Sequence, residues 1–201
     1  MKRTLSFVAL ALAAALTIAG CGGNDASTST STTTSSSRSN FNDADVTFAQ
    51  SMIPHHQQAI QMAKMAKMNA SSPEVQQLAE KVEAAQGPEI GTMTGWLQDW
   101  GKKAPADSES DMGGIDHDMD SMDRGDMPGM MSDAEMKKLD ASGAGFDRRF
   151  LTMMTEHHTG AIEMAKTEQA NGKNADAVAL AKKIEADQTA EIAQMKQLLK
   201  S

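Results

Sequence analysis

The sequence contains an internal repeat, and no other feature constrains the fold as strongly. When the chain is shifted by 102 residues, positions 48–97 align with positions 150–199 without a gap, and 20 of these 50 positions are identical. A repeat of this length is one supersecondary unit, which cannot bury its apolar face alone. We therefore expect the two copies to pack against each other.

Each copy is expected to form a helical hairpin. In the first copy, residues of the buried type recur at steps of four and three, which is typical of an amphipathic helix. This stripe consists of Phe48, Met52, His55, Ala59 and Met62. A break at residues 69–72 precedes Pro73, which can open a second helix, and the matching break lies at 171–174. No stretch shows the two-residue period of a strand, so we predict an all-α four-helix bundle made of two hairpins.

The predicted bundle covers residues 42–200, with repeats at about 43–100 and 145–200. Between the repeats, residues 101–131 form a long loop rich in methionine, aspartate and glycine. A loop of this length in a compact domain is usually functional or disordered.

The N-terminal region predicts export and a lipid anchor. A short basic segment and an apolar stretch at 5–18 indicate a signal peptide over residues 1–20. Cys21, the only cysteine, follows Ile-Ala-Gly as in a lipobox, and we expect it to be lipidated. Residues 21–41 are rich in Ser and Thr and are expected to be a flexible linker. The membrane contact would be through the lipid alone.

Charge and motifs exclude several classes of function. The chain has 27 acidic and 19 basic residues and a net charge of −8, which argues against a nucleic-acid partner. It contains no phosphate-cradling loop and no nucleophile–base pair, so we predict neither catalytic residues nor an organic cofactor. The oligomeric state is not indicated.

Histidine and methionine are concentrated at matching positions of the two copies. Four of the five histidines form two adjacent pairs, each flanked by methionines at the same offsets. Histidine is a poor helix former and is costly to bury when charged, so core filling alone does not explain the matched pairs. The predicted metal ligands are His55, His56, Met52 and Met62, with their counterparts His157, His158, Met154 and Met164.

Further candidates come from the second helix of each hairpin and from the loop. Counting from the turn places His55 level with residues 86–89. Glu89 and Glu191 are therefore predicted as ligands or as partners that orient a histidine ring, and Met93 and Met195 as weaker ligands. The loop would supply auxiliary metal capture, although its methionines could instead scavenge oxidants. The loop candidates are His117, Met119, Met122, Met127, Met130 and Met131.

The ligand types favour copper. Ferritin-like di-iron bundles place a glutamate three residues before the ligand histidine, but Met52 and Met154 occupy this position here. Thioether and imidazole ligands prefer Cu(I) and, by the same argument, Ag(I), and imidazole also accepts Cu(II). Zinc prefers Cys, His or carboxylate ligands. We therefore predict copper as the bound metal.

The motif His-His-x-x-Ala-Ile-x-Met-Ala at 55–63 and 157–165, with Glu-Ile-x-x-Met at 89–93 and 191–195, resembles the bacterial domain-of-unknown-function family 305. The resemblance covers about residues 42–199. It implies a ferritin-like four-helix fold, and it implies copper binding because some members are exported copper-binding proteins. Pro54 is replaced by Glu156 in the second copy, so the two half-sites are not expected to be fully equivalent.

The predicted function is therefore to bind and buffer copper, chiefly Cu(I), outside the cytoplasm, or to confer resistance to it. One alternative is a degenerate ferritin-like oxidase, which would turn over Fe(II) or Cu(I) in the same core. A second alternative is an interaction module in which His and Met only pack, so that chelation would leave its melting temperature unchanged.

Overall fold

The computed structural model describes residues 40–105 and 127–200, and all secondary structure within these ranges is helical. The elements are α1 (Asp43–Asn69), α2 (Pro73–Asp99), α3 (Asp133–Asp140), the 3₁₀ turn η2 (Gly143–Gly145), α4 (Phe146–Asn171) and α5 (Ala175–Leu198). The all-α prediction is confirmed for the described residues. The proposed signal peptide, Cys21, nearly all of the linker and the loop residues His117, Met119 and Met122 lie outside them.

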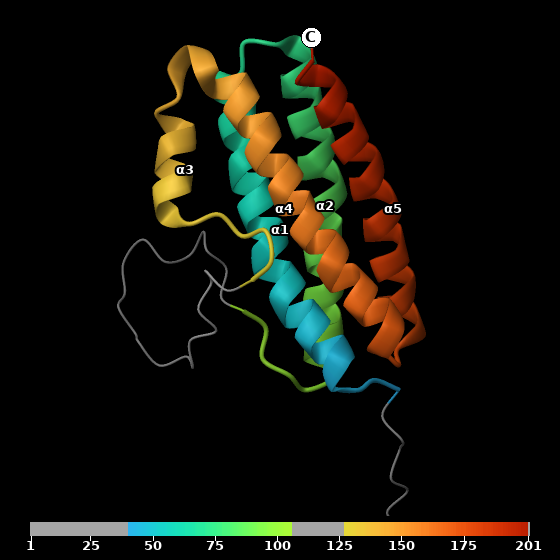
Figure 1. The fold of residues 1–201 in the computed structure, drawn as a ribbon. Coiled ribbons are helices and arrows are strands. Elements are labelled where there is room, and N and C mark those ends of the chain that lie inside the picture. The colour runs from blue at the N-terminus through green and yellow to red at the C-terminus, as the bar shows by residue number, and fades with distance from the viewer. Residues whose placement is uncertain (1–39, 106–126, 201) are drawn as a thin grey trace, which may run out of the picture. The chain divides into compact units, whose positions relative to one another are not determined.

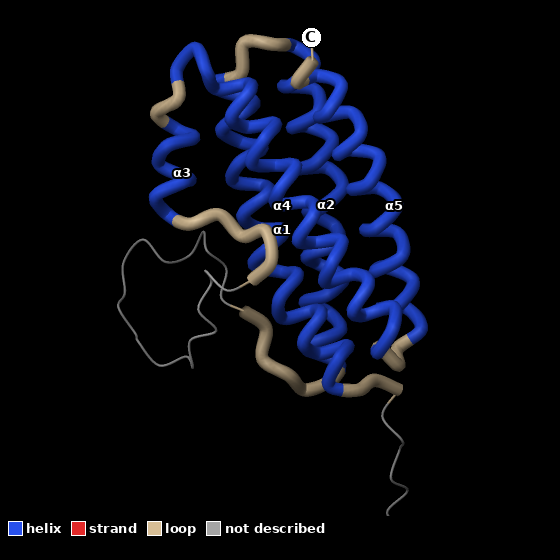
Figure 2. The backbone as a smooth tube through the Cα atoms, viewed as in Figure 1, coloured by secondary structure: helices blue, strands red, loops and turns tan. Residues whose placement is uncertain are grey.

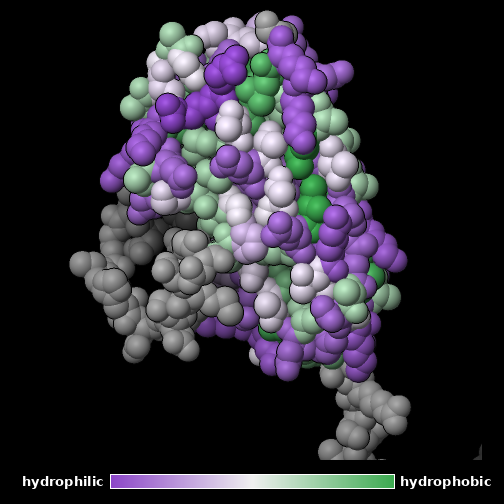
Figure 3. Space-filling view, viewed as in Figure 1, coloured by the Kyte–Doolittle hydropathy of each residue, from purple (hydrophilic) through white to green (hydrophobic). Residues whose placement is uncertain are grey.

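The four long helices lie side by side, and the short α3 lies against the outside of this group (Figure 1, Figure 2). α1 pairs with α2 and α4 pairs with α5, as expected for two hairpins, and α1 also packs along α4. The face shown in Figure 3 carries a mixture of hydrophilic and hydrophobic side chains. Within the described ranges, no helix has the length and apolar character that crossing a membrane requires.

Two apolar clusters show how α1 and α4 cross. One cluster joins Ala59 and Met62 of α1 to Phe150 of α4, near the start of that helix. The other joins Met52 of α1 to Ala165, in the C-terminal half of α4. The two helices therefore run antiparallel, and the segments that hold the histidine pairs lie between the two apolar clusters.

Helix ends are set by side chains that satisfy the free backbone N–H groups of the first turn. Asn42 caps α1 and forms a capping box with Asp45. Ser72 caps α2 just before Pro73, and Asn174 caps α5. These caps explain why the breaks predicted at 69–72 and 171–174 appear as the two hairpin turns.

An acidic residue in the first turn of each repeat's first helix bonds the hairpin turn of the other repeat. Asp45 accepts hydrogen bonds from the backbone N–H groups of Lys173 and Asn174 at 3.0 and 2.8 Å. Its counterpart Asp147 accepts from Ser71 and Ser72, both at 2.9 Å. These positions are related by the 102-residue shift. The same hydrogen bonds between a first-turn aspartate and the hairpin turn of the other copy therefore occur at both ends of the bundle.

The sequence analysis did not predict α3. Its signal was present, because Ser132 and Glu135 have capping-box spacing, and the structure shows both reciprocal hydrogen bonds of that box. Leu139 of α3 is fully buried in the core cluster. The helix is short, so its single buried leucine was too weak a periodic signal to indicate it.

Candidate metal site

A layer of polar side chains crosses the middle of the bundle. His55, His56, His157 and His158 all have 0% of their surface exposed. Glu89 bonds one of them from the partner helix, and Gln86 and Gln188 on the partner helices are also buried. We call these buried polar side chains the histidine layer. Burying polar groups inside an apolar core costs free energy unless they bond to something, so such a layer calls for an explanation.

The first histidines of the two pairs meet at the crossing of α1 and α4. The ring centroids of His55 and His157 lie 3.7 Å apart, with 37° between the ring planes. His158 is further away, with its ring centroid 6.3 Å from that of His157. The structure thus brings one imidazole of each repeat together in the interior of the bundle.

The second histidine of each pair bonds a glutamate on the other helix of its own hairpin. His56 Nε2 lies 2.9 Å from Glu89 Oε2, and His158 Nε2 lies 2.6 Å from Glu191 Oε2. A carboxylate can only accept, so the proton must be on Nε2, which leaves Nδ1 with a lone pair. In metal sites, a carboxylate that holds a histidine in this way fixes its tautomer and raises its basicity as a ligand.

Glu89 makes one contact that breaks the symmetry. Its second oxygen, Oε1, accepts from Lys183 Nζ at 2.9 Å, and Lys183 also bonds Asp187 at 2.8 Å. In the first repeat, Lys81 is the counterpart of Lys183 and Ala85 is the counterpart of Asp187. The carboxylate four residues after the lysine is therefore present only in the second repeat. Burial raises the pKa of Glu89, but its bonds to His56 and Lys183 outweigh this and hold the pKa below its usual value.

Five buried ring nitrogens in the layer have no hydrogen-bond partner. These are Nδ1 of all four histidines and Nε2 of His157. Leaving a buried polar group without a partner costs ~1–3 kcal/mol for each group. Unpartnered polar atoms at this density are unusual in a native core, and ordered water, a ligand or an ion would each supply the partners that they lack.

Burial keeps the imidazoles of His55, His56 and His157 neutral. Desolvation lowers the pKa of His55 to about 3, and the neighbouring His56 adds to the effect. Desolvation also lowers the pKa of His56, although Glu89 opposes it. The pKa of His157 is well below its usual value, first through desolvation and then through the nearby imidazoles. A neutral imidazole has a free lone pair, which is the form that binds a metal.

The predicted thioether ligands do not all occupy equivalent places. Met52, Met62, Met93, Met154 and Met195 are fully buried. Met52 and Met93 belong to the cluster on one side of the histidine layer, and the other three belong to the cluster on the opposite side. Met164, the counterpart of Met62, is only half-buried. Within residues 40–105 and 127–200, no three His, Cys, Asp or Glu side chains converge on one point that could hold an ion.

The end of the loop is docked over the histidine layer. His55 Nε2 donates to the carbonyl of Pro128 at 3.1 Å. Gln58 exchanges two hydrogen bonds with the backbone of Met131, at 2.8 and 2.7 Å. Residues 127–131, which we call the docked segment, were predicted only as part of the metal-capturing loop, and their contact with His55 was not predicted.

Two glycines permit this close approach. Gly129 has φ +76°, a conformation that favours glycine. A Cβ on Gly160 of α4 would overlap the carbonyl of Pro128. Gly160 is the counterpart of Gln58, so the same position clamps the docked segment in one repeat and makes room for it in the other. The docked segment therefore makes the two half-sites inequivalent.

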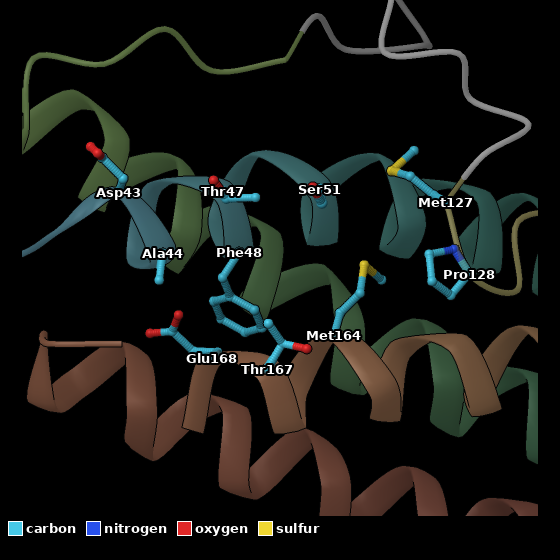
Figure 4. Close-up of a pocket in the computed structure, with 10 residues that line it drawn as sticks. All are labelled: Asp43, Ala44, Thr47, Phe48, Ser51, Met127, Pro128, Met164, Thr167 and Glu168. Atoms are coloured by element: carbon cyan, nitrogen blue, oxygen red, sulfur yellow. The ribbon is translucent and has the colours of Figure 1, made fainter. Parts of the chain in front are cut away.

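A cavity of about 390 Å³ lies beside this segment, between α1 and α4 (Figure 4). The side chains of Met127 and Met164 flank one end together with Pro128, and Glu168 lies at the other end, near Asp43 and Ala44 (Figure 4). The sequence analysis did not single out Glu168. Its counterpart in the first repeat is alanine, so the repeat gave no sign of it.

Comparison with known proteins places the chain in a family. Residues 45–199 match the family described as Domain of unknown function (DUF305). The chain belongs to the DUF305 family. This confirms the resemblance drawn from the two His-His motifs. No curated protein matches the sequence significantly.

Solved DUF305 structures resemble most of the chain. One from Streptomyces coelicolor, described as secreted, is 34% identical with a TM-score of 0.66, over 78% of this chain and 90% of that one. A DUF305 fragment from Deinococcus radiodurans is 27% identical with a TM-score of 0.66, over 79% and 96%. CopM in its Cu(I)-bound form is 32% identical with a TM-score of 0.60, over 78% and 95%. CopM structures also exist in Cu(II)-bound, Ag-bound and apo forms.

Proposed function

We propose that this DUF305 protein binds copper, chiefly as Cu(I), in the interior of the bundle and buffers it outside the cytoplasm. One observation carries the proposal: five buried ring nitrogens of the four histidines have no hydrogen-bond partner, and two of these rings, His55 and His157, are in contact. An ion that accepts some of these lone pairs would recover part of the free energy that the unpartnered nitrogens cost.

The donor set supports a soft ion. Imidazole nitrogens come from all four histidines, and fully buried thioethers lie on both sides of the layer, among them Met52 and Met154. Such donors suit Cu(I) and Ag(I), and imidazole also suits Cu(II). These are the ions present in the CopM structures, which match 78% of this chain at 32–35% identity.

The glutamates of the layer fit a supporting role better than a ligand role. The Oε2 atoms of Glu89 and Glu191 already accept from the Nε2 atoms of His56 and His158. We infer that they orient these rings and direct Nδ1 toward the ion, as carboxylates do in many metal sites. Met62, Met93 and Met195 remain candidate ligands on the walls of the layer.

Placement in the cell is part of the same proposal. Residues 1–20 would be removed as a signal peptide, and Cys21 would carry the lipid that tethers the protein through the linker at 21–41. One of the relatives, described as secreted, supports an extracytoplasmic place. We interpret the bundle as a ferritin-like four-helix fold of two hairpins, in which the loop at 101–131 collects metal.

A metal-dependent oxidase is the alternative that uses the same core. It would require repeated turnover of Fe(II) or Cu(I) with consumption of oxygen, whereas a buffer would bind a fixed number of ions. Oxygen uptake measured with excess Cu(I) or Fe(II) separates the two functions. A protein that only packs its His and Met side chains would bind no stoichiometric copper at all.

The proposal is tested by replacing both central histidines. We expect the purified His55→Ala/His157→Ala protein to keep its helical circular dichroism and to bind fewer Cu(I) ions than the wild type, measured by competition with a coloured Cu(I) chelator. His117→Ala, in the loop, is the matched control and should leave the interior sites loaded. Full stoichiometry in the double variant would contradict an interior site.

A further inference from the structure

The cavity between α1 and α4 has a distinct chemical character at each end. Its rim residues Asp43, Thr47, Pro128 and Thr167 are exposed, so the cavity reaches the surface. At one end lie the thioethers of Met127 and Met164, which come from different parts of the chain (Figure 4). Two thioethers facing one water-accessible space are a donor pair for a soft monovalent cation.

Each thioether belongs to a segment that either contains or contacts a central imidazole. Met164 follows His157 by seven residues, so the two side chains leave α4 about 20° apart and two turns from each other. Met127 directly precedes Pro128, whose carbonyl accepts the hydrogen bond from His55. The thioether end of the cavity therefore adjoins the segment that covers the histidine layer.

The docked segment must shift if an ion is to reach the layer from this side. Pro128 and Gly129 pack directly against Gly160, and Gln58 holds Met131 by two hydrogen bonds. The hydrogen bond from His55 to Pro128 engages an imidazole nitrogen that an ion could otherwise approach. Binding at Met127 would place the ion on the segment that has to move.

We propose that Met127 and Met164 form a separate, first binding site for Cu(I) or Ag(I), from which the ion passes to the buried histidines when the docked segment shifts. This inference rests on the proposed function of the layer and adds its route of access. The thioether site would be weaker than the interior site, because it has two donors and is open to water. The thioether site would affect the rate at which the buried histidines bind the ion, and not the number of ions that they bind.

The kinetic test uses a substitution that removes sulfur and keeps volume. Purified Met127→Leu/Met164→Leu protein is mixed with a coloured Cu(I) chelate, and ion transfer is followed by stopped flow. We expect transfer to slow by about tenfold, which corresponds to ~1.4 kcal/mol in the barrier, with the final stoichiometry of the interior histidines unchanged. Met68→Leu is the matched control, since Met68 is 75% exposed and does not line the cavity. Transfer as fast as in that control would overturn the proposal.

A second measurement needs no change in the cavity. In protein carrying ¹³C-labelled methionine methyl groups, Ag(I) should shift the Met127 and Met164 resonances and leave that of Met68 in place. The same shifts should persist in His55→Ala/His157→Ala protein, because the first site does not need the histidines. If these resonances do not move in either protein, the first site is wrong even where the interior still binds copper. If they move while the interior stoichiometry is the same in both proteins, the interior site is wrong and the first site stands.

Discussion

The imidazole rings of His55 and His157 lie 3.7 Å apart between centroids, although 102 residues separate them in the chain. Each ring comes from the middle of one of two antiparallel helices, so the contact marks the point where the two repeats cross. Both rings are fully buried, and together they have three nitrogens without a hydrogen-bond partner. The predictions below start from this contact and from the groups that support it.

Copper should stabilise the fold through the histidine layer. A ligand that binds only the native state adds ~2.7 kcal/mol at a hundredfold excess over its dissociation constant. For a chain of this size, this corresponds to a rise in melting temperature of about 5–11 °C. Differential scanning calorimetry under anaerobic conditions should show this rise for Cu(I) in the wild type and a much smaller one in His55→Ala/His157→Ala. An equal rise in both proteins would move the stabilising site away from the layer.

Removing either orienting carboxylate should weaken copper binding without abolishing it. We expect Glu89→Gln and Glu191→Gln each to lower Cu(I) affinity by about 10–100-fold, because the amide is a poorer acceptor for the Nε2 proton of its histidine. Competition titration against a Cu(I) chelator measures the effect. Glu80→Gln, at an exposed position of α2, is the control. Unchanged affinity in both layer variants would show that these glutamates only fill the core.

Glu168 should make stability fall as pH rises. Burial, together with the neighbouring carboxyl of Asp45, raises the pKa of Glu168 to about 8. Two ionised carboxylates would offer each other no donor, whereas a proton kept on Glu168 lets it donate a hydrogen bond to Asp45. The native state thus holds a proton that the unfolded chain loses above about pH 4.5, and the stabilisation fades between pH 4.5 and 8.

Glu168→Gln tests this titration. The amide is neutral at every pH, so the variant should exceed the wild type in unfolding free energy by a few kcal/mol at pH 9, on the order of the shift in pKa, and the gap should close toward pH 4. Urea unfolding at several pH values measures both proteins. Parallel pH profiles would show that Glu168 is ionised in the native state.

Gly160 should be intolerant of a side chain because the docked segment packs on it. Gly160→Ala puts a Cβ into the Pro128 carbonyl, and we expect it to lower the unfolding free energy by about 1–3 kcal/mol or to displace the segment. Gly95→Ala in α2 is the matched control, since a Cβ there meets nothing within 4 Å. The control should be stabilising by up to ~1 kcal/mol, because alanine is the better helix former. Equal gains in both variants, measured by urea unfolding, would contradict the docking.

The sequence by itself determined the repeat, the helical hairpins and their turns. It did so because the 3.6-residue period, Pro73 and the polar breaks act locally, and because a second copy doubles each signal. It also indicated the histidine layer, since the same buried pattern recurs at His55 and His157. Only the tertiary structure decided that these two rings touch and which nitrogens remain without partners, because both depend on the crossing of α1 and α4.

The differences between the two copies were also decided by the tertiary structure. The contact of Pro128 with His55, the cavity between Met127 and Met164, and the burial of Glu168 each depend on a residue without an identical counterpart in the other repeat, namely Pro128, Met127 and Glu168. Local periodicity and repeat alignment cannot detect such residues, since their environment comes from segments distant in sequence. The docked segment packs against both α1 and α4, so its position depends on how these two helices are arranged.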